Sequence, residues 1–430
     1  MKKTLLLTTA LGLASASQLM AVDLFITGST AFRANVYTAC QKLYDTGAPA
    51  SITYGDAAHG GDANNNSKTA SWCMTGTVSN NITVLGTTPL TIHGLFTGSI
   101  QGMQTVEQGT KLWFATPTTG VYVTNTPTIA FSDCSGTASP YPATGNFSEE
   151  NVCVQPFVIA KSVGLTSVTN VTWDQLRYGI AAGRIPLSTW TGKPTDHSSY
   201  VYVIQRTKDS GTRRVELAES QFGYNAPCVV YLYDNVTNNI FYKPSATAIV
   251  GSAGNANANL NWGSGYVSGG NIATELAYNT AANQAFAVLS IGDARSVTGV
   301  NWSQVIAFNG LYPTAAGPGI SGNTGTNDFT PIAEGLYPLW GYEVIVYPNV
   351  DPSSLNADQN LTAAQLGNQS ATGTILGVLD AQTLINGGSP LAGSIENEIE
   401  LSKTAANGAT AIRLSDMVSS RQAVGGTITP

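Results

Sequence analysis

Four apolar, strand-like runs in this chain each end in a short polar turn, and this repeated construction constrains the fold more than any other feature. The turns occupy residues 27–30, 98–102, 132–136 and 206–212. Glycine and small hydroxyl residues dominate them, and helical periodicity resumes after three of the four. Strands that alternate with helices in this way predict an α/β sheet. In such a sheet, polar turns that follow strands gather ligand groups at the carboxyl ends of those strands.

The turn at 206–212 has the composition of an anion-binding helix start. Ser210 or Thr212 is placed to cap the following helix, and Gly211 lets the backbone come close to a guest. Free N–H groups at a helix start attract anions, and Arg206 adds a planar fork of donors that matches a tetrahedral oxyanion. The alternative is an ordinary capped helix with a surface arginine.

Residues 1–21 have the pattern of a secretory signal peptide. Two lysines form the basic start, an apolar run extends over 5–13, and small residues at 14–16 or 19–21 supply a cleavage site. The apolar run is too short to span a bilayer, and no later run is long enough. We therefore expect an exported protein in the periplasm or outside the cell, peripheral to a membrane at most.

The composition argues against two classes of partner. Charged residues make up 10% of the chain, and the formal net charge is −7. An acidic chain with few lysines is poorly suited to nucleic acid. It also has no basic amphipathic stretch for a membrane surface.

The chain has five cysteines, which in an oxidising compartment allow two disulfides and one free thiol. Proximity along the chain suggests Cys40 with Cys73 and Cys134 with Cys153, which leaves Cys228, although sequence does not fix the pairing. No C-x-x-C pair occurs, so neither a zinc site nor a redox motif is indicated.

The length is sufficient for two lobes with separate cores. A strand-like run at 155–160 leads into the second lobe, and a strong strand pattern at 342–348 returns to the first. The expected division is a first lobe of residues 22–155 plus 330–430 and a second lobe of 156–329. A polar stretch at 55–88 is expected to be an inserted loop or hairpin in the first lobe.

With these segments in order, the chain resembles the phosphate-binding proteins of bacterial ABC importers, which have the type 2 periplasmic binding-protein fold. The matching segments are Gly28-Ser29-Thr30-Ala31, Gly98-Ser99-Ile100-Gln101-Gly102, Phe131-Ser132-Asp133, Arg206 with Ser210-Gly211-Thr212, the stretch from 171 to 190, and 335–339. The chain departs from the family at Lys208, where the family usually has an acid, and at Arg33, and it is longer than the usual member.

The resemblance implies an α/β fold of two lobes with a hinge, closing on phosphate or a similar oxyanion for an ABC permease. It implies no cofactor, no metal and no catalytic residue. The ligand-binding residues that it implies are Ser29, Thr30, Ser99 and Asp133 in the first lobe and Arg206, Ser210, Gly211 and Thr212 in the second.

Within this resemblance Asp133 is the residue that would select the ligand. A carboxylate beside an anion is repulsive unless it accepts a hydrogen bond from that anion. Hydrogen phosphate carries a proton at neutral pH and sulfate does not, so an acid here favours phosphate. The alternative is a turn residue that caps its own backbone.

Other constellations are weaker. The run from Asp62 to Asn66 has part of a calcium-loop spacing but lacks its glycine and closing glutamate. His59, His93 and His197 are too few and too scattered for a zinc cluster, and no nucleophile elbow occurs. We therefore do not expect an enzyme. The rival function is a surface or matrix protein that uses the same scaffold for adhesion or assembly.

Overall fold

The computed structural model describes most of the chain from residue 21 to residue 429. The ranges outside the description are residues 1–20, 46, 60–67, 140–145, 225–227, 235–239, 243–264, 278–283, 296–303, 316–327, 351, 353–359, 369, 380–383, 386–388, 391–394, 396–398, 400–409, 423 and 430. The predicted signal peptide and the candidate calcium loop lie outside the described residues.

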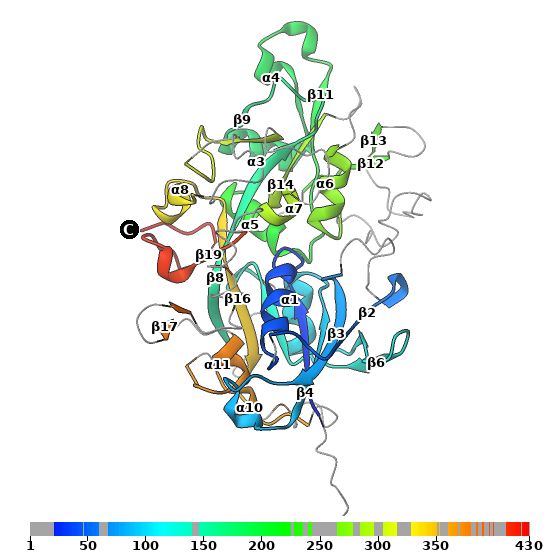
Figure 1. Cartoon of the computed structure of the whole chain (residues 1–430). Coiled ribbons are helices and arrows are strands. Elements are labelled where there is room, and N and C mark those ends of the chain that lie inside the picture. Colours follow the sequence, from blue (N-terminus) through cyan, green and yellow to red (C-terminus); the bar gives the residue numbers. More distant parts are fainter. Residues whose placement is uncertain are drawn as a thin grey trace, which may run out of the picture.

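The chain folds into two α/β lobes that lie end to end, as predicted (Figure 1). Two long antiparallel strands, β8 (Phe147–Lys161) and β16 (Trp340–Pro348), connect them, and we call these the connecting strands. The first part of β8 pairs with β16, and its last part pairs with β14 (Ala285–Ser290) of the second lobe. The lobe boundaries at 155/156 and 329/330 remain predictions.

The sheet of the first lobe has a parallel centre and an antiparallel edge. Its strands, in spatial order from β16, are β7 (Ile129–Ser132), β1 (Val22–Gly28), β4 (Pro89–Leu95), β3 (Ser71–Thr77) and β2 (Ser51–Tyr54). The three central strands are parallel and almost wholly buried, as expected for strands covered on both faces. Helices α1 (Arg33–Lys42) and α2 (Ser99–Glu107) follow β1 and β4.

The polar stretch at 55–88 is more than a peripheral insertion. It contains β3, which lies inside the sheet between β2 and β4 and pairs with β4 along its whole length. Trp72 and Met74 are fully buried. The surrounding glycine and asparagine residues hid this strand in the sequence, because its apolar residues are few.

The second lobe continues the sheet through β14 and β11 (Tyr200–Val203) to the edge strand β10 (Arg184–Pro186). Its remaining main elements are β9 (Asn170–Val171), β15 (Val305–Phe308), α3 (Trp173–Ala182), α4 (Ser188–Thr191), α5 (Gly211–Glu219), α6 (Gly269–Ala277), α7 (Ile291–Arg295), β12 (Leu232–Asp234) and β13 (Ile240–Tyr242). Helix α3 begins with the predicted cap, because Thr172 and Gln175 form a capping box.

Smaller elements cover the connecting strands and the end of the first lobe. They are β5 (Leu112–Ala115), β6 (Tyr122–Asn125), α8 (Thr330–Ala333), α10 (Ala363–Leu366), α11 (Ile375–Leu379), β17 (Leu384–Ile385), β18 (Ser389–Pro390) and β19 (Ile412–Arg413), with 3-10 turns that include Thr83–Leu85 and Leu414–Asp416. Strand β19 pairs with β8, so the C-terminal segment returns to the junction of the lobes.

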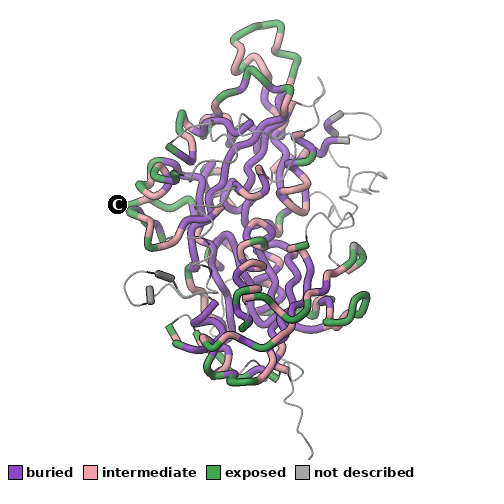
Figure 2. Tube along the Cα trace, in the orientation of Figure 1, coloured by how far each residue is buried: buried purple, intermediate pink, exposed green. Residues whose placement is uncertain are grey.

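Buried residues fill the inside of both lobes (Figure 2), and the apolar ones form two large cores. One core fills the second lobe and extends past the junction to Ile100 and Met103 of α2. The other lies in the first lobe, between its sheet, α1 and the segment that contains α11. Among the described residues no helix is long and apolar enough to cross a membrane.

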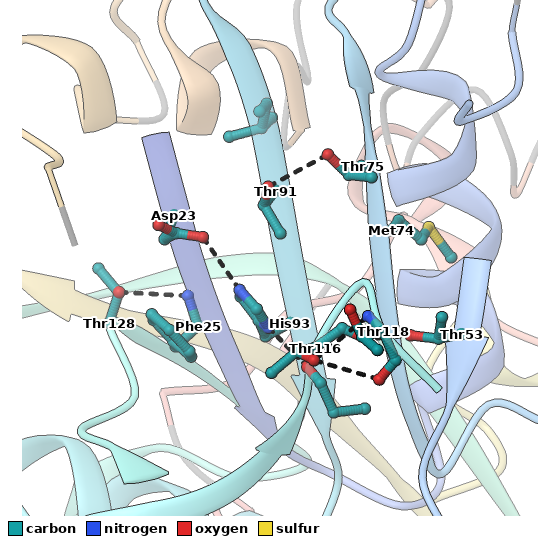
Figure 3. A network of polar contacts seen from close by, with 12 residues as sticks. Asp23, Phe25, Thr53, Met74, Thr75, Thr91, His93, Thr116, Thr118 and Thr128 are labelled. Atoms are coloured by element: carbon teal, nitrogen blue, oxygen red, sulfur yellow. Dashed lines mark hydrogen bonds and ion pairs between the residues drawn. The ribbon is translucent and has the colours of Figure 1, made fainter. Parts of the chain in front are cut away.

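The two predicted disulfides are wrong, since none of the five cysteines is in a disulfide. Cys40 packs in the first-lobe core with Trp72 and Met74. Cys73 lies between these two on β3, so it points to the opposite face of the sheet. Its cross-strand neighbours on that face are Thr53 and His93, which belong to the polar network of Figure 3.

The second pairing fails for the same reason. Cys134 packs in the second-lobe core, whereas Cys153 packs in the first-lobe core. The sheet therefore separates the two sulfur atoms, although only a turn and part of a strand separate the residues along the chain. Burial raises the pKa of the Cys134 thiol to about 12, so this side chain is an inert, protonated core residue.

Candidate functional site

The four polar turns meet at the junction of the lobes. Three of them follow the parallel strands β1, β4 and β7, whose carboxyl ends lie at the same edge of the sheet. The backbone N–H of Gly98 donates to the carbonyl of Gly28 at 2.9 Å. The fourth turn reaches them from the second lobe, because the N–H of Ile100 donates to the carbonyl of Asp209 at 3.0 Å.

Arg206 lies at the centre of this junction and is almost completely buried. Its Nη2 donates to the hydroxyl of Thr30 in the first lobe at 2.9 Å, and its Nη1 donates to the hydroxyl of Thr212 at 3.3 Å. Nη2 and Nε also donate to the carbonyls of Val267 and Tyr266 in the second lobe. The planar guanidinium is therefore held in one orientation, facing residues of both lobes.

Asp133 is the acidic partner at the same place. Ser29 donates a hydrogen bond to its Oδ1, and Thr212 donates to its Oδ2 at 3.1 Å. Its backbone N–H donates to the hydroxyl of Ser99 at 3.2 Å. The carboxylate thus joins hydroxyls of both lobes instead of capping its own turn.

Helix α5 begins at this point. Ser210 is its N-cap and accepts from the N–H of Arg213 at 3.3 Å, which decides between the two candidate caps. Gly211 comes next, and a Cβ at this position would lie 2.6 Å from the Ser99 Oγ and 2.8 Å from the Asp133 Cβ. The first turn of the helix therefore packs directly against the first lobe, and glycine is required for that approach.

The structure brings together all eight residues of the sequence-based prediction, and each of them is buried. They are Ser29, Thr30, Ser99, Asp133, Arg206, Ser210, Gly211 and Thr212. Their role as ligand-binding residues remains a prediction.

The charge of Arg206 is balanced by acidic residues. Burial lowers the pKa of Arg206, and the negative charges of Asp293 and Asp133 oppose this shift, whereas Arg33 adds to it. Asp293 is buried in α7, just after β14, where it accepts from the Ser290 hydroxyl at 2.9 Å. Two buried acids therefore act on the charge of Arg206.

Asp293 was not among the predicted site residues, although the signal for it was present. Asp293 follows a buried strand-like run in the same way as the four polar turns, so the same pattern could have identified it. Glu343, a fully buried acid of β16 close to Asp133, was not predicted either. A single acid within a strand pattern usually marks the solvent face, so no local signal distinguished it.

The chemistry that this arrangement can perform is recognition of an anion. Hydroxyl groups, the start of a helix and one guanidinium are all hydrogen-bond donors, and they converge from two lobes. Among the described residues no group of three or more His, Cys, Asp or Glu side chains could hold a metal ion.

Comparison with known proteins gives structural similarity without sequence similarity. No family model matches the chain, and no curated protein sequence matches it. Solved structures do match. This chain is structurally similar to phosphate-binding proteins.

Three of these structures illustrate the similarity. An ABC-type phosphate transport receptor from Vibrio cholerae is 16% identical, with 79% of this chain and 99% of that chain covered and a TM-score of 0.39. A phosphate-binding protein from Stenotrophomonas maltophilia is 13% identical, with 91% of each chain covered and a TM-score of 0.42. A human phosphate-binding apolipoprotein is 14% identical, with 91% of each chain covered and a TM-score of 0.38.

Proposed function

We propose that this protein binds phosphate, or a similar tetrahedral oxyanion, between its two lobes. The observation that carries the proposal is the position of Arg206, a buried cation that donates to Thr30 of the first lobe and to Thr212 of the second. An anion bound at this point would accept hydrogen bonds from both lobes at once. Such a ligand would stabilise the closed arrangement of the lobes.

The donor set is sufficient for useful affinity. A hydrogen bond to a charged group contributes roughly 1.5–3 kcal/mol. Three or four such bonds would cover the roughly 8 kcal/mol of micromolar binding, before the costs of association are subtracted. Ser29, Thr30, Ser99, Ser210 and Thr212 supply hydroxyl groups, and the start of α5 adds backbone N–H groups at Gly211 and Thr212.

Asp133 gives the site its selectivity in this proposal. Its carboxylate would accept the proton of hydrogen phosphate, whereas sulfate offers no proton and would meet unrelieved repulsion. The protein would then serve as the exported capture component of an ABC importer, with a permease as its partner and no catalytic step.

A scaffold function is the second candidate, and one observation favours it. The residues of the junction bond to one another directly, through Ser29 and Thr212 with Asp133 and through Arg206 with Thr30. Two of these contacts, Thr212 with Asp133 and Arg206 with Thr30, join the two lobes directly. A surface or matrix protein that used the fold for adhesion or assembly would need no ligand there.

Calorimetric titration distinguishes the two candidates. The mature protein, unfolded and refolded to remove bound anion, is titrated with phosphate and then with sulfate. We expect tight phosphate binding with little response to sulfate. The variant Arg206→Gln should lose phosphate binding, whereas Arg177→Gln, which removes an exposed arginine of α3, should bind like the wild type.

Thermal unfolding of each variant checks that the fold is retained, and Arg206→Lys serves as a second variant that keeps the buried charge. If folded wild-type protein binds neither anion, the transport proposal is wrong and the scaffold function is favoured.

A further inference from the structure

Glu343 of β16 lies close to Asp133, the first residue of the turn that follows β7. Strand β16 pairs antiparallel with β7, and Val344 is opposite Ser132. Glu343 and Asp133 directly adjoin this pair along the chain, and the charge of Asp133 acts on the Glu343 carboxyl. Two residues further along, a Cβ on Gly341 would be 2.5 Å from the Asp133 carbonyl oxygen, so β16 is tightly packed against the turn.

The carboxyl of Glu343 is completely buried, and none of the described residues gives either of its oxygens a hydrogen bond. Asp133 approaches closely enough to interact, but its own oxygens accept from Ser29 and Thr212. A buried acid without a donor is unstable as an anion, because nothing replaces the water that it has lost. Of the two neighbouring acids, Glu343 and Asp133, Glu343 is therefore the one that keeps a proton.

The electrostatic environment agrees with this assignment. Burial raises the pKa of Glu343 well above its ordinary value, and the negative charge of Asp133 raises it further. Two adjacent carboxyls in a buried site do not both ionise readily. Asp133, by contrast, accepts hydrogen bonds from two hydroxyls.

Among the described residues, no cation offsets the effect of burial on Glu343. In the turn after β7, burial raises the pKa of the Cys134 thiol to about 12, and Cys153 of β8 is opposite Glu343 in the sheet. The positive charge of Arg214 on α5 lowers the pKa of the Cys134 thiol and so opposes the effect of burial there. Helix α2 also packs against β16, but its titratable residue, Glu107, faces Glu149.

We propose that Glu343 is a positioning residue that acts through Asp133, and that its proton couples anion binding to pH. This inference rests on the proposed oxyanion-binding function and adds a form of regulation to it. With the proton on Glu343, Asp133 and Asp293 are the acids that act on Arg206, and Glu343 adds no further negative charge. Without it, a second negative charge would lie next to the bound anion and would repel it.

Proton uptake follows from this arrangement. An anion bound beside Asp133 makes the ionised form of Glu343 still less favourable. At a pH where part of the protein has lost this proton, binding therefore transfers up to one proton per molecule from the buffer to a Glu343 carboxyl oxygen. Affinity should then fall with rising pH by up to about tenfold per pH unit, the limit for one linked proton.

The test is titration with inorganic phosphate over a pH series from about 6 to about 10, in pairs of buffers with different ionisation enthalpies. The buffer difference measures the protons taken up on binding. Wild-type protein is compared with Glu343→Gln, which places a neutral side chain of the same shape beside Asp133. Glu216→Gln is the matched control, because Glu216 is also a fully buried glutamate whose pKa is raised by burial.

We expect alkaline pH to weaken phosphate binding more steeply in the wild type and in Glu216→Gln than in Glu343→Gln. Proton uptake should be smaller in Glu343→Gln by up to one proton. The titration of phosphate itself contributes equally to the pH dependence in all three proteins. The difference between Glu343→Gln and the other two proteins therefore measures the contribution of Glu343. If wild-type protein binds phosphate but Glu343→Gln has the same pH profile and the same uptake, this inference alone is wrong. If folded wild-type protein does not bind phosphate at neutral pH, the proposed function fails and this inference fails with it.

Discussion

The guanidinium of Arg206 donates a hydrogen bond of 2.9 Å to the hydroxyl of Thr30, a residue 176 positions earlier in the chain. The two residues belong to different lobes, and both are buried. This contact brings the positive charge of the second lobe against the first polar turn of the chain. It is therefore a direct link between the closure of the lobes and the proposed binding of an anion.

The contact can be removed without changing the shape of the side chain. Thr30→Val should weaken phosphate binding by roughly ten- to hundredfold, because one hydrogen bond to a charged group contributes about 1.5–3 kcal/mol. Calorimetric titration measures the change. Thr38→Val on α1 is the control, since the Thr38 hydroxyl donates a solvent-exposed hydrogen bond to the Ala34 carbonyl of its own helix. Equal affinities in the two variants would show that Thr30 has no part in binding.

A methyl group at Gly211 should hold the lobes apart. The added Cβ would lie 2.6 Å from the Ser99 Oγ and 2.8 Å from the Asp133 Cβ, so one lobe has to move. We expect Gly211→Ala to lower phosphate affinity at least tenfold and to increase the radius of gyration measured by X-ray scattering. Gly292→Ala on α7 is the control, because its nearest atom would be 3.8 Å away. A compact Gly211→Ala variant with unchanged affinity would count against closure at this point.

Replacing Asp133 by asparagine should relax the discrimination between phosphate and sulfate. The amide has no negative charge to repel sulfate, so sulfate affinity should rise while phosphate affinity falls. Competition titration of one anion against the other gives the ratio directly. An unchanged preference for phosphate in Asp133→Asn would remove Asp133 from the selective role and leave it as a structural link between Ser29 and Thr212.

The sequence was informative where chemistry is local. The end of each strand is marked by a change from apolar residues to small polar ones, so the turns that carry Ser29, Ser99, Asp133 and Arg206 could be recognised one at a time. Parallel strands then bring their carboxyl ends to one edge, which predicts that the turns meet. Their hydrogen-bond partners depend on how the lobes close, and no local pattern encodes that.

The errors have a common physical cause. The disulfides were assigned by nearness along the chain, but the alternation of side chains across a strand separates Cys40 from Cys73 by the thickness of the sheet. Glu343 was missed because a lone acid within a strand pattern indicates a solvent-facing position. The structure shows that both faces of this strand are covered, because successive residues of β16, which point to opposite faces, are nearly all buried.

Glu216 should make the protein less stable as the pH rises. Burial raises the pKa of this α5 side chain from 4.5 to about 8, and Arg213 opposes the shift. Between these two values the folded state binds more protons than the unfolded state. The free energy of unfolding therefore falls with increasing pH, by up to about 1.4 kcal/mol per pH unit from this group.

The variant Glu216→Gln should lose this slope and should be the more stable protein above pH 8. Urea unfolding at a series of pH values measures the free energy of unfolding of each protein. Glu334→Gln, at an exposed position, is the control. Parallel pH profiles for wild type and Glu216→Gln would mean that Glu216 does not titrate with folding.

The C-terminal segment should stabilise the far end of the helix that begins at the site. Arg421 is buried, forms an ion pair with Glu219 at the end of α5 and lies 3.9 Å from the centre of the Trp340 ring. The N–H of Gly425 donates to the same Glu219 carboxylate at 2.7 Å. The tail thus connects α5 to the connecting strand β16.

Arg421→Met keeps much of the side-chain volume but leaves the buried acid without its cation, and breaking a buried pair in this way costs about 3–5 kcal/mol. Denaturant unfolding should show a loss of this size. The double variant Arg421→Met with Glu219→Gln should recover part of the lost stability, because it no longer buries an uncompensated charge. The amide oxygen of Gln at position 219 can still accept the hydrogen bond from the Gly425 N–H. If the double variant is no more stable than Arg421→Met, the ion pair is not what fixes the tail, and the packing of Arg421 on Trp340 becomes the explanation.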